Sequence, residues 1–128
     1  GIYVAKNCNP VSNQKNPPAD AIKVYNFFGI AAYDGQEFLS GSRYAFRQGW
    51  TTPEKAIIGG AKWIADNYIY GAYNQNTLYK MRWNPANTGV HQYATDIGWA
   101  IKQTQTMNQI YQLINNPSTP RYSIVEYN

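Results

Sequence analysis

Apolar residues toward the C-terminal end of the chain recur at intervals of three or four positions. This spacing is typical of an amphipathic helix, and it holds for Ile97, Ile101, Thr104, Met107, Tyr111 and Ile114. Thr95 or Asp96 stands just before the run, where either side chain can cap a helix. The sequence Asn-Asn-Pro at 115–117 follows it. The pattern therefore predicts a long helix that ends before the proline, because proline cannot continue a helix.

A second helix start is indicated by residues 51–54, Thr-Thr-Pro-Glu. Thr51 and Glu54 have the spacing of a capping box, and Pro53 stands where a helix needs no backbone N–H. The apolar residues that follow are spaced by four, three and four positions: Ile57, Ala61, Ile64 and Tyr68. Gly59 and Gly60 lie inside this helix, although each glycine costs about 1 kcal/mol relative to alanine there. We therefore expect a bulky ring or another backbone to pack closely against them.

Shorter elements complete the predicted fold. A short helix over 41–48 would begin at Ser40 and end at Gly49, and a helical turn over 78–81 would be capped by Asn76. The apolar run 22–30 is rich in β-branched and aromatic residues, which favours a strand or an extended segment. Residues 5–20 contain Pro and Asn in turn-forming combinations and are expected to form an irregular loop. These patterns together predict a mostly helical domain with small irregular or β parts.

Composition narrows the class of protein. The chain has 128 residues, which fits one domain, and its 44% hydrophobic and 16% aromatic content favours a packed core over disorder. No run of about 18 apolar residues is present, so no membrane insertion is expected. The net charge of +4 suits an anionic partner, but no basic cluster larger than residues 80–82 supports nucleic-acid binding. A single cysteine and a single histidine exclude an internal disulfide and disfavour a zinc site, and no metal or cofactor is expected.

The richness in Tyr, Trp, Asn and Gln suggests a sugar as ligand. Aromatic rings stack on the apolar face of a pyranose, while amides and hydroxyls pair with its polar groups. Among the seven acidic residues, Asp34 follows an apolar segment at a turn and Asp96 stands at a helix start. Each also has a plain structural interpretation, as a turn aspartate and as a helix cap, and these alternatives stay open at this level.

Five strings in a fixed order carry a resemblance to a known family. They are YNFFGIAAYD at 25–34, GWTTPEKAI at 49–57, GGAKWI at 59–64, NTLYKMRWNP at 76–85 and HQYATDIGWA at 91–100. From about Val24 to Tyr111 the chain resembles the endo-β-N-acetylglucosaminidase domain of bacterial autolysins, glycoside hydrolase family 73. The resemblance implies a mainly α (α+β), lysozyme-like domain with two lobes and a substrate groove between them. It also divides this single domain into an irregular loop (1–23), a best-matched core (24–116) and a C-terminal tail (117–128).

The activity that the resemblance implies is hydrolysis of peptidoglycan at the β-1,4 bond after N-acetylglucosamine, for wall turnover or lysis. The implied partners are the glycan strand and anionic wall polymers, and the protein would be a secreted, wall-associated bacterial monomer. The family's general-acid Glu lies in a segment resembling E-T-G-x-G-T-S-x-L-A-x-G, and Gly1 resembles the last glycine of that segment. The acid is therefore expected before Gly1, and the 128-residue chain alone is expected to be inactive. A non-catalytic module that binds wall oligosaccharides is the alternative.

The resemblance also implies roles for individual residues. Tyr93 would line the catalytic centre and support the transition state or the substrate's acetamido group. Asp34 is the first candidate for a second carboxylate, and Asp20 is the second. The mechanism, inverting or retaining through substrate assistance, is left open. The residues expected to bind substrate are Tyr25, Asn26, Phe28, Tyr33, Trp83, Asn84, His91, Gln92 and Asp96.

Overall fold

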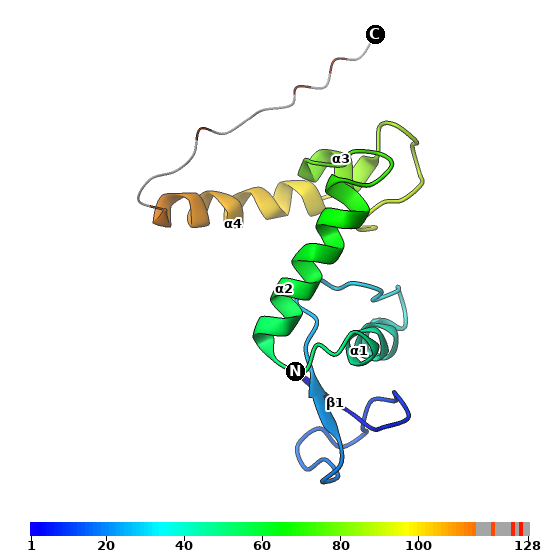
Figure 1. Ribbon diagram of the computed structural model, residues 1–128. Helices are drawn as coiled ribbons and strands as arrows, with labels where there is room; N and C mark the ends of the chain where they lie inside the picture. The colour runs from blue at the N-terminus through cyan, green and yellow to red at the C-terminus, as the bar shows by residue number, and fades with distance from the viewer. Residues whose placement is uncertain (115–118, 120–123, 125, 127–128) are drawn as a thin grey trace. The chain divides into compact units, whose positions relative to one another are not determined.

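The computed structural model describes residues 1–114, 119, 124 and 126 (Figure 1). These residues form two compact units, divided between Ala65 and Asp66, and each unit is described by itself. The chain is mostly helical with one small two-stranded sheet, as predicted. No helix among the described residues is long and apolar enough to cross a membrane. Most of the predicted C-terminal tail, 117–128, lies outside the described residues.

The sheet belongs to the first unit and corrects the prediction that residues 1–23 are an irregular loop. Strand β1 (Ile2–Val4) pairs antiparallel with strand β2 (Ile22–Val24), with Ile2 opposite Val24. An isolated bridge from Val4 to Pro10 folds the intervening loop back on β1. Each strand has only three residues, which is too short for an alternating pattern to stand out. Their pairing partner lies some twenty residues away, so only the tertiary structure reveals the sheet.

Helix α1 (Glu37–Arg47) begins about one turn before the predicted start. Ser40 therefore lies inside the helix, and its Oγ donates to the carbonyl oxygen of Gln36 at 2.8 Å rather than capping an end. The added first turn, Glu-Phe-Leu-Ser at 37–40, includes the apolar residues Phe38 and Leu39, which the prediction left outside the helix. The predicted end is confirmed, because Gly49 follows the helix with a φ of +68°, a conformation that favours glycine.

Helix α2 (Pro53–Ile64) starts at its predicted proline, but its N-cap is Thr52 and not Thr51. The Thr52 Oγ1 accepts the backbone N–H of Lys55 at 3.3 Å. The buried face also differs by one position from the predicted one: Ala56 and Gly60 are buried, while Ile57 is 49% exposed. A π-helix, η1 (Ala65–Ile69), follows α2.

The core of the first unit explains the two glycines of α2. Trp50 and the apolar residues Val4, Val24, Ile30, Ala45 and Ala56 form this core, and Phe28 and Trp63 pack against it. A Cβ at position 59 would collide with the indole of Trp50, and one at position 60 would collide with the ring of Phe28. The expectation that bulky rings pack against this pair of glycines is confirmed.

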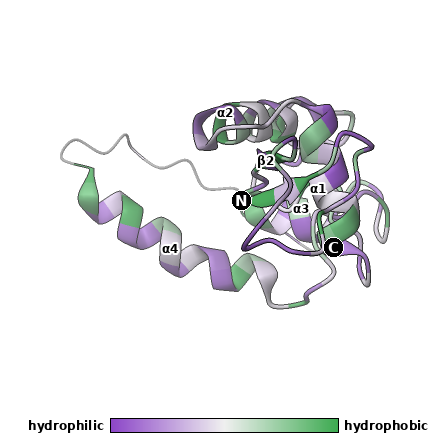
Figure 2. Cartoon of the chain, turned by 90° about the horizontal axis from the view of Figure 1, so that it is seen from below, coloured by the Kyte–Doolittle hydropathy of each residue, from purple (hydrophilic) through white to green (hydrophobic). Residues whose placement is uncertain are grey.

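The second unit contains helices α3 (Leu78–Trp83) and α4 (Trp99–Leu113), which pack against each other. The N-cap of α3 is Thr77 rather than Asn76, and its Oγ1 accepts the N–H of Lys80 at 3.1 Å. Helix α4 follows Gly98, so neither Thr95 nor Asp96 is its N-cap. Figure 2 shows apolar and polar residues interspersed along α4, yet no residue of this helix is buried among the described residues. The predicted helix is present, and its apolar side chains are exposed or half-buried.

Candidate functional site

A cluster of aromatic rings surrounds Tyr93 in the second unit. The ring of Tyr93 meets the edge of Tyr68 at a centroid distance of 5.2 Å and lies 4.9 Å from Trp99. The imidazole of His91 lies 4.5 Å from the ring of Tyr68 and 5.7 Å from that of Tyr73. The structure thus brings together Tyr93 and His91, two residues of the predicted site, through Tyr68, which the sequence placed only on a helix face.

The surroundings of Tyr93 favour the protonated form of its phenol. Burial, together with the smaller effect of the charge that Tyr68 would carry, raises the pKa of Tyr93 to about 12. Burial alone also raises the pKa of Tyr68. At neutral pH both hydroxyls therefore carry their protons. The backbone N–H of Tyr93 donates to the carbonyl oxygen of Met81 at 2.9 Å, which ties this residue to α3.

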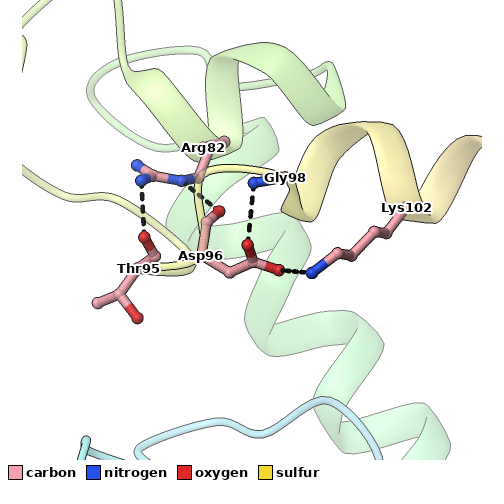
Figure 3. Close-up of polar contacts among 5 residues, drawn as sticks. All are labelled: Arg82, Thr95, Asp96, Gly98 and Lys102. Atoms are coloured by element: carbon pink, nitrogen blue, oxygen red, sulfur yellow. Dashed lines mark hydrogen bonds and ion pairs between the residues drawn. The ribbon is translucent and has the colours of Figure 1, made fainter.

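Arg82 holds the segment that follows Tyr93. Only 5% of Arg82 is exposed, and its Nε and Nη2 donate to the carbonyl oxygens of Asp96 and Thr95, each at 2.8 Å (Figure 3). The guanidinium carbon lies 4.1 Å from the centre of the Trp83 ring, which is a cation–π contact. Sequence reasoning missed Arg82, although its place inside the NTLYKMRWNP string was a signal that it is not a simple surface charge.

Asp96, whose side chain is exposed to solvent, also stabilises the segment that follows Tyr93. Its Oδ1 accepts the N–H of Gly98 at 2.9 Å, and its Oδ2 forms an ion pair with Lys102 Nζ at 2.6 Å (Figure 3). The hydrogen bond from Lys102 is the main cause that lowers the pKa of Asp96, and the Gly98 N–H adds to it. The carboxylate is exposed, but these contacts use both of its oxygens. Asp96 thus supports the start of α4 without being its cap.

Asn84 and Trp83, predicted to bind substrate, have different surroundings. Asn84 is fully buried in the left-handed conformation that ends α3, with a φ of +43°, and its Nδ2 donates to the carbonyl oxygen of Val90 at 2.7 Å. In this structure the Asn84 side chain is buried and stabilises the loop through its bond to Val90, so its predicted contact with substrate stays a prediction. Trp83 is partly exposed, and the guanidinium of Arg82 lies over its ring. Gln92 is partly exposed beside Tyr93 in the chain.

The other predicted residues belong to the first unit. Tyr25 stacks on Phe27 at 6.0 Å and lines a pocket of about 240 Å³ between the sheet and α1. Asn26 also borders this pocket, but its side chain forms hydrogen bonds with the backbone of Ile30. Its Nδ2 donates to the Ile30 carbonyl oxygen at 2.8 Å, and its Oδ1 accepts the Ile30 N–H. Phe28 packs on Gly60 in the core. Asn26 and Phe28 thus make loop-forming and packing contacts, while the rings of Tyr25 and its neighbour Phe27 line the pocket.

The carboxylate candidates of the first unit both lie at the surface. Asp34 stands with Tyr33 in a turn before α1, and both side chains are exposed. Asp20 is exposed in the turn that leads into β2. Within the described residues, no three His, Cys, Asp or Glu side chains come together in a way that could hold a metal ion.

Comparison with known proteins identifies relatives of this chain. No family model matches the chain. The chain is 54% identical over 105 residues to a β-N-acetylglucosaminidase of Bacillus subtilis (strain 168), a match that covers 81% of this chain and 12% of that protein. It is 51% identical over 104 residues to a bifunctional autolysin of Staphylococcus epidermidis, covering 81% of this chain and 8% of the relative. The chain thus spans only a small part of the length of these curated relatives.

Solved structures agree in fold. Crystal structures of Staphylococcus aureus autolysin E match at 44% identity over 84% of this chain. One is a catalytic mutant in complex with the disaccharide NAG-NAM, with a TM-score of 0.62 and 45% of that chain covered. Another is a complex with the muropeptide NAM-L-Ala-D-iGlu, with a TM-score of 0.63 and 47% of that chain covered. This likeness confirms the mainly α, lysozyme-like fold class. With about half of its matched residues identical to these enzymes, the chain belongs to the family of bacterial β-N-acetylglucosaminidases and autolysin glucosaminidases.

Proposed function

We propose that this chain is part of an endo-β-N-acetylglucosaminidase that hydrolyses the β-1,4 bond after N-acetylglucosamine in peptidoglycan. The observation that carries the proposal is the identity of about one half to relatives named β-N-acetylglucosaminidase and autolysin. A solved relative bound to NAG-NAM supports a glycan strand as the substrate. None of these names favours the alternative of a non-catalytic binding module. A secreted, wall-associated location follows from such a substrate and is part of the proposal.

The chemistry of glycoside cleavage explains what Tyr93 would do. An acid must protonate the leaving oxygen, and a base, a nucleophile or the substrate's acetamido oxygen must act on the other face of the sugar. We assign the acid to a glutamate of the complete catalytic domain outside this chain. Because the Tyr93 phenol stays protonated, it can donate a hydrogen bond to the acetamido oxygen or steady the charge of the transition state. Its ring neighbours fix it in place, which such preorganised stabilisation requires.

The test uses the complete catalytic domain that contains this chain. It is incubated with purified peptidoglycan, and the soluble products are reduced with borohydride and identified by mass spectrometry. A glucosaminidase releases fragments whose reducing sugar is N-acetylglucosamine, so reduced N-acetylglucosamine is the expected new end. Reduced N-acetylmuramic acid at that end would show a muramidase and contradict the proposal. Retained binding to walls without any new reducing end would instead support the binding-module alternative.

The second carboxylate is tested separately. We propose Asp34 for this role, because it is the last residue of the string YNFFGIAAYD and its carboxylate is exposed to solvent. Asp34→Asn should then lower the rate of product release strongly, while Asp20→Asn, an equally exposed aspartate in the same unit, should not. Equal and near-full activity of both variants would exclude both carboxylates and leave substrate assistance as the mechanism.

A further inference from the structure

Gln75 is one of the most deeply buried side chains among the described residues. Only 1% of it is exposed. Its Nε2 donates to the carbonyl oxygen of Lys80 at 2.8 Å and to that of His91 at 3.0 Å. Its Oε1 lies 2.7 Å from Nδ1 of the His91 ring. One amide thus joins the start of α3 to both the backbone and the side chain of His91.

These contacts decide which way the amide points. If the amide were turned over, its oxygen would face the two carbonyl oxygens of Lys80 and His91, and three acceptors would meet without a proton among them. The orientation with Nε2 toward the carbonyls is therefore the one that satisfies every buried group. The oxygen Oε1 then faces the ring of His91 and can only accept.

The tautomer of His91 follows from this orientation. Because Oε1 accepts, Nδ1 of His91 must carry a proton. In the neutral ring, Nε2 then has a lone pair and is an acceptor. His91 is exposed, and no described residue is recorded as a hydrogen-bond partner of its Nε2. A histidine that lies beside the rings of Tyr68 and Tyr73 thus presents a fixed acceptor at the surface.

The backbone at His91 is also held in an unusual state. Its φ is +53°, in the left-handed region that residues other than glycine rarely adopt. The hydrogen bond from Gln75 Nε2 to the His91 carbonyl holds this conformation. Strain of this kind persists only where the surroundings over-determine it, and it is often found at ligand-binding sites.

We propose that Gln75 is a positioning residue that fixes the tautomer and the orientation of His91, so that His91 Nε2 accepts a hydrogen bond from an N–H or O–H of the N-acetylated sugar. This inference rests on the proposed function for its substrate. Aromatic rings beside the acceptor suit a sugar, whose apolar face can stack while one polar hydrogen reaches Nε2. His91 makes the contact, and Gln75 acts through it.

The tautomer is tested on the unaltered chain by NMR. His91 is the only histidine, so its ring nitrogens give one unambiguous set of long-range ¹H–¹⁵N signals. At about pH 9, above the ordinary range of histidine titration, we expect Nδ1 to be protonated and Nε2 to be unprotonated. Free histidine in water favours the opposite tautomer. A proton on Nε2 in the folded chain would overturn the proposal.

The contact with sugar is tested by adding the disaccharide NAG-NAM to the same sample. The Nε2 resonance should shift toward that of a hydrogen-bonded acceptor, and His91→Ala should weaken binding of the disaccharide about tenfold, the factor that corresponds to one net hydrogen bond. An Nε2 signal that does not move at saturating disaccharide would refute the contact. These readouts do not depend on catalysis, so they decide the inference even if the proposed reaction is wrong.

The part played by Gln75 is tested by Gln75→Met in the complete catalytic domain, with Gln105→Met as a matched control at an exposed position of α4. Gln75→Met should raise KM about tenfold with little change in kcat, the pattern of lost ground-state binding. In the His91→Ala background, Gln75→Met should add almost nothing. A loss that persists in that background, or an unchanged KM in the single variant, would contradict the positioning role. Should Gln75→Met fail to fold, the NMR result and His91→Ala still decide the proposal.

Discussion

At the scale of single residues, the second unit is organised by buried polar side chains rather than by apolar ones. Among its described residues, those that are buried are Tyr68, Gln75, Arg82 and Asn84. Arg82 and Gln75 donate to backbone carbonyls on either side of Tyr93, so the segment that carries Tyr93 is held by hydrogen bonds. Leaving one partner of such a bond unpaired in a buried site costs about 1 to 3 kcal/mol. Loss of either donor, Arg82 or Gln75, is therefore expected to loosen the segment that carries Tyr93.

Replacement of Tyr93 by phenylalanine tests its hydroxyl. In the complete catalytic domain, Tyr93→Phe should lower the initial rate of peptidoglycan hydrolysis roughly 10²-fold or more, the effect of losing one preorganised donor. The fold should survive, because the ring contacts with Tyr68 and Trp99 are kept. Asp96→Asn is the comparison: it should lower the melting temperature modestly, because its contacts are to Gly98 and Lys102, and leave the rate nearly unchanged. The opposite pair of outcomes would mean that the two roles are reversed.

Alkaline pH offers a second test of Tyr93. Because burial raises the pKa of Tyr93 from 10.0 to about 12, the folded state resists ionisation more than the unfolded state does. The stability linked to this group is fully present below about pH 10 and is lost as pH rises toward 12. Tyr93→Phe should therefore lose less stability than the unaltered chain between about pH 10 and 12 in thermal melts. The part of the loss that stays comes from Tyr68, whose pKa burial also raises.

The control for this experiment is Tyr70→Phe. Tyr70 is 82% exposed, so its removal should leave the alkaline loss of stability as it is in the unaltered chain. Equal pH dependence in the Tyr93→Phe variant and the unaltered chain would show that the Tyr93 phenol is not buried in solution.

At the scale of elements, neighbouring residues in the sequence determine where the helices end, but they do not determine which face of a helix is buried. Pro53 opens α2 and Gly49 closes α1, as the sequence predicts, because these residues act through their own backbone preferences. The buried face of α2 is instead chosen by two rings, Trp50 on Gly59 and Phe28 on Gly60. Ile57, predicted to face the core, is half exposed because these rings set the rotation of the helix.

Gly60→Ala measures how closely the Phe28 ring packs on α2. Alanine favours a helix by about 1 kcal/mol over glycine, but its Cβ would collide with the ring of Phe28. Overpacking of a core costs typically about 1 to 3 kcal/mol, so after the propensity gain we expect a net loss of up to about 2 kcal/mol in the free energy of unfolding in urea. Ala61→Gly, at the next and exposed position, measures the propensity term alone. A Gly60→Ala variant more stable than the unaltered chain would show that the ring moves away freely.

At the scale of the whole molecule, a net charge of +4 with only 14% charged residues suggests a mild, dispersed attraction to anionic surfaces. We expect binding to purified cell walls to weaken steadily as salt rises from low to about physiological strength, because exposed charges are then screened over about 8 Å. A pull-down on whole walls across a salt series measures it, with walls stripped of anionic polymers as the control. Binding that is equal at every salt concentration would mean that ring stacking and hydrogen bonds dominate and that the charge serves solubility.

The sequence by itself determined the features that depend on neighbouring residues. The spacing of apolar positions was sufficient to predict that α2 and α4 exist. Gly49 was sufficient to predict the end of α1. The strings around Tyr93 were sufficient to predict the family. These signals are local, because a cap, a break or a motif is carried by a few consecutive side chains. Even here the exact caps moved by a position, from Thr51 to Thr52 and from Asn76 to Thr77, because either hydroxyl or amide suits a cap and the packing of the helix chooses between them.

Only the tertiary structure decided which polar side chains are buried and what they hold. Arg82 and Gln75 read as surface residues in the sequence, since arginine and glutamine are mostly exposed in proteins. They are buried here because carbonyl groups of the 91–96 segment, up to sixteen positions along the chain, supply their hydrogen-bond partners. The pairing of β1 with β2 also depends on the tertiary structure, because the three residues of each strand do not specify their partner strand. Burial of a polar group is stable only when its distant partner is in place, so no local pattern could have assigned Gln75 to His91 or Arg82 to the loop after Tyr93.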